Sequence, residues 1–395
     1  MDSIKTIYEM TGIEELINSP SSILMLFFSI TILYLGIKKK YEPLLLVPIG
    51  FGMLLANLPG ANLGVSDVQE VSLLEIARKY GIINFLYYSL IKSGFLPPII
   101  FMGVGALTDF GPMLKNLRLV FFGGAAQIGI FTVLVSATLL GLPANEAASI
   151  AIIGGADGPT AIYTSIILAP HLLGPIAIAA YSYMALVPVI IPFVVKFTLT
   201  DNELKINMKK QDENFPSKKK IMNLESLKII FPIVMTILIS IVVPSSAPLI
   251  GLLMFGNLIK EIGTSTGRLS KAASSTILNS ATIFLGLSIG ATMTAESFLN
   301  FKTISIIIGG LMAFIISIFG GILAVKIFNI FTHKKINPLI GATGLSAVPM
   351  ASRVANDIAL KHDSNNHIMH YAMASNISGV IGSAIAAGIL ISFLS

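Results

Sequence analysis

Long apolar stretches separated by short polar segments run through almost the whole chain. A membrane-spanning helix needs about 20 consecutive apolar residues, with a range of about 17–25. The pattern therefore predicts an all-α polytopic membrane protein. We expect ten stretches to cross a membrane: 21–37, 43–58, 82–107, 119–140, 172–197, 229–243, 248–262, 272–295, 303–331 and 368–394.

Several of these stretches depart from a simple span. Residues 43–58, 229–243 and 248–262 are short for a membrane helix, and Lys92 and Pro97-Pro98 favour a break within 82–107. Residues 63–79 are polar with spaced apolar side chains, which is typical of an interfacial helix. Small residues on the last stretch predict close packing against other helices: Gly379, Gly382, Ser383, Ala386 and Ala387.

Two further apolar segments, 147–168 and 338–355, contain glycine, proline and polar residues that disfavour a regular helix. Irregular backbone at membrane depth is tolerated only where it is buried in protein or lines a wet cavity. The first segment carries Asp157 within the string GGADGPTAIY (154–163). An intramembrane carboxylate indicates a functional site. The alternative is a tight loop between helices in which Asp157 is paired for structural reasons.

The two irregular segments match each other. Residues 155–162 (GADGPTAI) align with 341–348 (GATGLSAV), so that Thr160 stands opposite Ser346 and Asp157 opposite Thr343. Further matches keep nearly the same spacing: 100–104 with 283–287, 116–118 with 300–302, 123–124 with 309–310 and 56–58 with 256–258. We predict an N-terminal segment (1–20), a first membrane repeat (21–198), a cytoplasmic linker (199–223) and a second repeat (224–395). With five spans and one re-entrant or broken segment each, the repeats would be inverted, as in ion-coupled transporters.

Composition supports a membrane protein and excludes several kinds of chemistry. The 395 residues are 54% hydrophobic and 12% charged, whereas a soluble domain carries about 25% charged residues. Because there is no cysteine, disulfides, iron–sulfur clusters and thiolate zinc sites are excluded. The chain has no GK[ST] phosphate-binding loop, so direct use of ATP is not supported.

Lysine and arginine predict the orientation, because cytoplasmic loops are enriched in both residues. With five spans per repeat, most of the basic residues fall on one side: 38–40, 115, 118, 205, 209–210, 218–220, 268, 271, 334–335, 353 and 361. We therefore place the central linker in the cytoplasm. Lys302 and the Arg78-Lys79 pair do not fit this arrangement.

The polar residues of the two irregular segments suggest a cation site. One carboxylate combined with neutral oxygens suits a small hard cation such as Na+ or H+. Asp157 supplies the charge, and the candidate neutral ligands are Thr160, Asn337, Thr343 and Ser346. Arg353 follows the second segment and could grip a carboxylate, although a positive-inside anchor explains it equally well. For Tyr183, in the middle of a predicted span, packing with one hydrogen bond is the favoured interpretation from the residue alone.

Four strings together resemble the β subunit of the sodium-translocating, biotin-dependent decarboxylases, which act on oxaloacetate, methylmalonyl-CoA, glutaconyl-CoA or malonate. They are GGADGPTAIY (154–163), AAYSYMALVP (179–188), NPLIGATGLSAVP (337–349) and SGVIGSAIAAG (378–388). In that family the β subunit decarboxylates carboxybiotin held by a carrier subunit, consumes a proton and exports Na+. The resemblance implies an elevator-like homotrimer in a bacterial or archaeal inner membrane. The partners it implies are biotin-carrier, carboxyltransferase and small membrane-anchor subunits.

The resemblance also implies roles for individual residues. Asp157 would be the central Na+ ligand, and Asn337, Gly341 and Ser346 would form the contribution of the second segment. Tyr183 would join the ion path or deliver the proton, and Arg353 would bind the carboxybiotin head on the cytoplasmic side. The alternative function is an Na+- or H+-coupled secondary transporter in which Arg353 grips a small organic anion and no chemistry occurs.

Overall fold

The computed structural model describes residues 19–395 apart from 41, 67, 69–70, 216–222 and 300, and the predicted N-terminal segment lies almost wholly outside this part. Within it, every regular element is a helix. Six helices are long and apolar enough to cross a membrane, or up to eight if each of two bent pairs is one span. The all-α membrane architecture predicted from the sequence is therefore confirmed, with fewer full-length spans than expected.

All ten predicted stretches contain helix, but two are too short to count as spans by length alone: α4 has 14 residues and α16 has 15. The first half of the chain forms α3 (Pro20–Ile37), α4 (Pro43–Ala56), α5 (Leu73–Leu86), α6 (Leu96–Leu107), α7 (Gly111–Lys115), α8 (Leu117–Ala126), α9 (Ile128–Leu139), α10 (Ala144–Ala151), α11 (Gly158–Leu168) and α12 (Leu173–Thr198). The described part of the linker forms α13 (Asp201–Leu204) and α14 (Met208–Asn214). The second half forms α15 (Leu224–Val242), α16 (Ala247–Glu261), α17 (Gly267–Lys271), α18 (Leu278–Ala291), α19 (Ala295–Phe298), α20 (Phe301–Phe331), α21 (Leu339–Ala342), α22 (Met350–His362) and α23 (Met369–Leu394).

Two local predictions can be compared with these elements. The break expected within 82–107 is present, because α5 with its π-helical continuation η1 (Tyr87–Ile91) meets α6 at a bend of 68°. The prediction of an interfacial helix at 63–79 is wrong for the first part of this range. Helix α5 begins only at Leu73, where the Ser72 side chain accepts a hydrogen bond from the Glu75 amide. Residues before it instead form hydrogen bonds to distant groups, such as the bond from the Val65 N–H to the Ala291 carbonyl.

Two pairs of helices join the halves of the chain in the same way. Helix α4 packs on α18, and α16 packs on α6. In each pair an asparagine, placed just after α4 or near the end of α16, donates to a carbonyl just beyond the end of the partner helix. Asn57 reaches the Met293 oxygen at 2.7 Å, and Asn257 reaches the Thr108 oxygen at 2.8 Å. These are corresponding positions in the sequence matches, so equivalent parts of the two halves make equivalent contacts.

Glycine lets these helices approach closely. A Cβ atom on Gly52 would lie 2.2 Å from the Leu287 oxygen, and one on Gly105 would lie 1.9 Å from the Leu253 oxygen. Side chains at these positions would force the helices apart, which is the usual reason for small residues at crossings of membrane helices.

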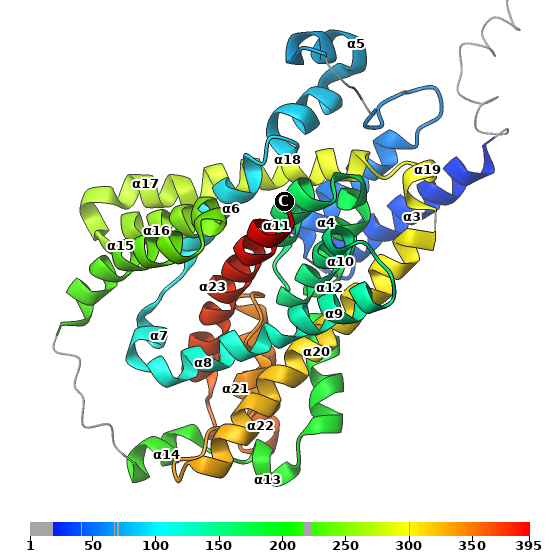
Figure 1. Ribbon diagram of the computed structural model, residues 1–395. Coiled ribbons are helices and arrows are strands. Elements are labelled where there is room, and N and C mark those ends of the chain that lie inside the picture. Colours follow the sequence, from blue (N-terminus) through cyan, green and yellow to red (C-terminus); the bar gives the residue numbers. More distant parts are fainter. Residues whose placement is uncertain (1–18, 41, 67, 69–70, 216–222, 300) are drawn as a thin grey trace, which may run out of the picture.

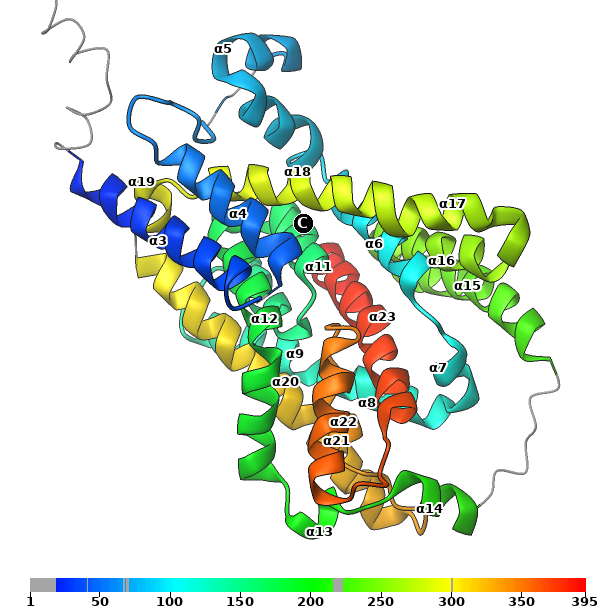
Figure 2. The same cartoon turned by 180° about the vertical axis from the view of Figure 1, so that it is seen from behind.

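The remaining long helices enclose the two irregular segments. Figures 1 and 2 show α23 running alongside α11 and α8, with α20 crossing the same region and α13, α14, α21 and α22 gathered at one end. Helices α3 and α15 lie at the periphery. Only 17% of the apolar stretch of α3 and 11% of that of α15 is buried within the protein. Their exposed apolar faces are those expected of helices that contact lipid.

Candidate functional site

The first irregular segment is a helix broken at the predicted position. Helix α10 tightens into the 3-10 turn η2 (Ile152–Gly155), and Ala156 then takes a left-handed conformation with φ 53°. Asp157 caps the next half-helix, α11, by accepting a hydrogen bond from the Thr160 amide at 3.3 Å. Pro159 occupies the first turn of α11, where its missing N–H costs nothing. The break therefore places a carboxylate at the amino end of a half-helix, where the helix dipole favours negative charge.

The second irregular segment is broken as well, and its loop touches the first. Helix α21 ends at Ala342, and α22 begins only at Met350. Between them, the Ser346 amide donates to the Gly155 carbonyl at 2.9 Å. The Ser346 hydroxyl donates to Asp157 Oδ2 at 2.8 Å. The structure thus brings together two residues that the sequence assigned to one site.

A third segment reaches the same oxygen. Ser383, near the middle of α23, donates its hydroxyl to Asp157 Oδ2 at 2.9 Å. The sequence predicts only a packing role for Ser383, so this contact is not foreseen from it. A small polar residue among glycines and alanines carries no signal that separates the two roles.

The surroundings of Asp157 are buried and rich in oxygen. Asp157 is 5% exposed, and Thr160 and Ser383 are fully buried. Among the residues that the structure describes, Thr160 Oγ1 and Gln127 Oε1 have no hydrogen-bond partner. A Cβ on Gly155 would lie 3.7 Å from Gln127 Oε1, so this amide oxygen faces the break in the first segment. Carboxylate, hydroxyl and amide oxygens form a donor set that suits a hard cation.

Two other predicted ligands, Asn337 and Thr343, form hydrogen bonds elsewhere. Asn337 donates its amide group to the carbonyls of Leu204 and Ile206, both at 3.0 Å, which ties the second segment to the linker. Thr343 donates its hydroxyl to the carbonyls of Ile340 and Ala372 at 2.7 and 3.0 Å. Their roles as Na+ ligands stay predictions.

Gly341, another predicted ligand, is held by close packing. A Cβ there would lie 2.1 Å from the Gly321 oxygen on α20. Its role as an Na+ ligand also stays a prediction.

Tyr183 and Arg353 lie away from the oxygens around Asp157. The Tyr183 hydroxyl donates to the Ile307 carbonyl on α20, and its ring stacks on Phe314. Arg353 is exposed on α22, next to the loop that holds Ser346, and makes no ion pair within the described part of the chain. The roles in proton delivery and in carboxybiotin binding implied for these residues stay predictions.

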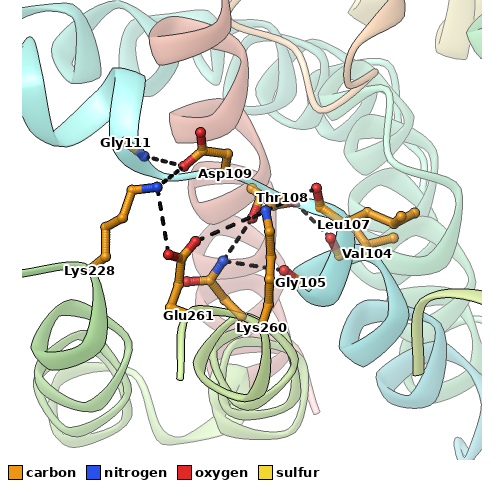
Figure 3. Close-up of polar contacts among 10 residues, drawn as sticks. Val104, Gly105, Leu107, Thr108, Asp109, Gly111, Lys228, Lys260 and Glu261 are labelled. Carbon is orange, nitrogen blue, oxygen red and sulfur yellow. Dashed lines mark hydrogen bonds and ion pairs between the residues drawn. The ribbon is translucent and has the colours of Figure 1, made fainter. Parts of the chain in front are cut away.

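Two of the charged clusters outside this site are built around Lys228 and Glu146. In Figure 3, Lys228 on α15 joins Asp109, which follows α6, at 2.6 Å and Glu261 on α16 at 3.6 Å. Burial alone would raise the pKa of Asp109, but hydrogen bonds from Lys228 and the Gly111 amide outweigh it and lower that pKa. The cluster pins the loop after α6 to the helices of the second half.

The other cluster is centred on Glu146 at the start of α10. Its carboxylate pairs with Lys302 at 3.1 Å and with His171 at 3.0 Å. Burial would raise the pKa of Glu146, but hydrogen bonds from Lys302 and His171 lower it overall. Lys302, which did not fit the predicted orientation, is therefore charge-paired.

Comparison with known proteins assigns both halves of the chain to one family. A family profile described as "Na+-transporting oxaloacetate decarboxylase beta subunit" matches residues 21–394. The methylmalonyl-CoA decarboxylase subunit beta of Propionigenium modestum is 46% identical over 99% of each chain. The oxaloacetate decarboxylase beta chain of Klebsiella pneumoniae is 42% identical over 100% of this chain and 99% of its own. The methylmalonyl-CoA decarboxylase subunit beta of Veillonella parvula is 46% identical over 94% and 93% of the two chains.

Proposed function

The chain belongs to the family of Na+-transporting decarboxylase β subunits, and from this premise we propose that it decarboxylates carboxybiotin and exports Na+. In this reaction the bond between the carboxyl carbon and the biotin nitrogen breaks, CO2 leaves, and the nitrogen takes up one proton. The upstream acid is chosen by a partner subunit, which fits the mixture of oxaloacetate and methylmalonyl-CoA enzymes among the relatives.

The transported Na+ binds, in this proposal, at Asp157. The observation that carries the proposal is the shared Oδ2 atom of Asp157, which accepts hydrogen bonds from Ser346 on the second irregular segment and Ser383 on α23. A buried carboxylate is costly unless a charge compensates it. Na+ would supply that charge, with the unpartnered oxygens of Thr160 and Gln127 as further ligands.

The coupling follows from the geometry of the site. Its three contributing segments come from both halves of the chain, so ion binding favours the conformation in which they meet. Decarboxylation would favour another conformation, and the two events are coupled because each shifts the same equilibrium. The equivalent contacts of α4 with α18 and α16 with α6 support two inverted repeats working as an elevator-like transporter.

The cytoplasmic side would receive the carrier. Arg353 on the exposed face of α22 is our candidate for the group that binds the carboxylated head, because a guanidinium matches a carboxylate in bidentate fashion. The proposal includes biotin-carrier, carboxyltransferase and small membrane-anchor partners. It also includes a homotrimeric state in the inner membrane and a cytoplasmic linker.

The test is to purify the protein with its native partners, reconstitute it in vesicles and measure avidin-sensitive decarboxylation and Na+ uptake. Asp157→Asn should abolish both while the complex still assembles, because removing a charge does not hinder membrane insertion. Glu296→Gln, at an exposed position, is the matched control. Na+-dependent turnover by Asp157→Asn would place the ion site elsewhere. Na+-coupled anion uptake without avidin sensitivity would favour a secondary transporter.

A further inference from the structure

Helix α12 carries two tyrosines, Tyr181 and Tyr183, separated by one residue. We infer that the hydroxyl of Tyr181, and not that of Tyr183, completes the Na+ site at Asp157. This inference rests on the proposed function and assigns an additional ligand to the same site. Residues two positions apart on a helix point to nearly opposite sides, so only one of the tyrosines can face Asp157.

The hydroxyl and the ring of Tyr183 both have partners within the protein. Its hydroxyl donates to the Ile307 carbonyl, and its ring stacks on Phe314 with the ring centroids 6.4 Å apart and the planes at 24°. Both contacts are with α20. This side chain joins α12 to α20 and is not directed at the break in the first segment.

Tyr181 lies directly against that break. A Cβ atom on Gly158 would lie 2.0 Å from Cε1 of the Tyr181 ring and 2.4 Å from Cζ, the carbon that carries the hydroxyl. The ring therefore occupies the space that any other side chain at position 158 would fill. Gly158 follows Asp157 in the sequence, so the hydroxyl lies beside the carboxylate-bearing turn.

The hydroxyl of Tyr181 has no partner of its own. The residue is 1% exposed, and the hydroxyl forms no hydrogen bond to any residue that the structure describes. Buried polar groups are normally satisfied, and an exception calls for an explanation. A bound cation supplies one, because a phenolic oxygen has lone pairs to offer.

Three of the unpartnered buried oxygens lie on or against the broken segment that carries Asp157. Tyr181, Thr160 and Gln127 each bury an oxygen without a partner. Oδ2 of Asp157 is shared by two serine hydroxyls, whereas Oδ1 accepts one weak bond of 3.3 Å from the Thr160 amide. A hard monovalent cation bound on the Oδ1 side would satisfy this set, and Na+ is the cation that the proposed function supplies.

The experiment compares three tyrosine-to-phenylalanine variants in the complex with its native partners: Tyr181→Phe, Tyr183→Phe and Tyr34→Phe. Tyr34 is 51% exposed on α3 and serves as the control. Two quantities are measured, the Na+ concentration for half-maximal decarboxylation and the Na+-dependent rise in melting temperature without carboxybiotin. Tyr181→Phe should need about tenfold more Na+, the size expected for one lost contact to an ion. Tyr183→Phe should change this concentration by less than about twofold.

The melting temperature separates a ligand from a packing residue. Without Na+, Tyr181→Phe should melt at the same or a higher temperature than the wild type, because the variant removes an unsatisfied buried hydroxyl. With Na+, it should gain less stability than the wild type. Wild-type Na+ dependence of Tyr181→Phe, or a tenfold shift in Tyr183→Phe alone, would overturn the inference. If Asp157→Asn also kept its Na+ dependence, the proposed ion site itself would fail, which is a distinct outcome.

Discussion

Ser346 and Asp157 lie 189 residues apart in the sequence, and their side chains are joined by a hydrogen bond of 2.8 Å from Oγ to Oδ2. The bond connects the loops of the two broken segments, which also touch through the Ser346 amide and the Gly155 carbonyl. One carboxylate oxygen thus depends on both halves of the chain. Any movement of one broken segment relative to the other must change the surroundings of Asp157.

The two serines at Asp157 Oδ2 give the first prediction. Ser346→Ala and Ser383→Ala each remove one hydrogen bond to a charged group, worth about 1.5–3 kcal/mol. We expect the Na+ concentration for half-maximal decarboxylation to rise about tenfold or more in each variant. Because the two hydroxyls share one oxygen, the effect of the double variant on the free energy of Na+ binding should differ from the sum of the two single effects.

The control for these variants lies on the same helix as Ser383. Ser392 bonds to Ser245 at an exposed position of α23, so Ser392→Ala should leave the Na+ dependence unchanged. Wild-type Na+ dependence in both Ser346→Ala and Ser383→Ala would show that the hydrogen bonds to Oδ2 of Asp157 do not contribute to Na+ binding.

Much of this site could be predicted from the sequence because its centre breaks a local rule. Glycine, proline and a carboxylate inside an apolar stretch contradict a regular helix, and this conflict identified Asp157 and its counterpart segment with Ser346. Ser383 and Gln127 could not be found in this way. A serine on a small-residue face and a glutamine between two helices break no local rule. Ser383 reaches Asp157 only through the packing of α23, and Gln127 reaches Gly155 only through the packing of the junction between α8 and α9.

The sequence predicts where the helices lie, but not their exact lengths or the ion pairs between them. All ten apolar stretches contain helix, but α4 and α16 are shorter than a span. Asn57, just after α4, and Asn257, near the end of α16, bind carbonyls at the ends of the partner helices. Lys302 did not fit the predicted orientation because charge counting ignores partners. The structure places it against Glu146, a contact between residues 156 positions apart.

This contact gives a prediction for pH dependence. The pKa of Glu146 is lowered from its ordinary value of 4.5 in the folded protein. The stabilisation is therefore fully present above about pH 4.5 and is lost as the pH falls through the lower, folded-state pKa. Lys302→Met should cost about 1 kcal/mol or less at pH 7, because Lys302 is 62% exposed on its side chain.

Melting temperatures in detergent between pH 7 and pH 3.5 test this. The difference between Lys302→Met and the wild type should shrink as the pH falls, and Lys302→Arg should restore most of the stability. A difference that stays constant over this pH range would mean that Lys302 acts through packing and not through the charge of Glu146.

The orientation can be tested in a chain that has no cysteine of its own. A single cysteine at the exposed Lys209 of α14 should react with an impermeant reagent only after the membrane is opened, because we place the linker in the cytoplasm. The predicted linker also contains Lys218, which lies outside the described residues. Labelling of Lys209→Cys in intact cells would contradict the inverted arrangement of the repeats.

The last prediction concerns Arg353. If its guanidinium binds the carboxylated biotin head, Arg353→Lys keeps the charge but loses the planar fork, so the variant should be impaired despite being conservative. A charged hydrogen bond is worth about 1.5–3 kcal/mol, which corresponds to roughly ten- to a hundredfold in carboxybiotin turnover. Na+ binding without biotin should change much less, because Arg353 is exposed while the oxygens around Asp157 are buried. An anchor that only orients the chain predicts the opposite, since lysine and arginine count alike in orientation. Wild-type turnover by Arg353→Lys would therefore remove Arg353 from the site, whereas a loss of turnover with intact Na+ binding would assign it to the carboxylated head.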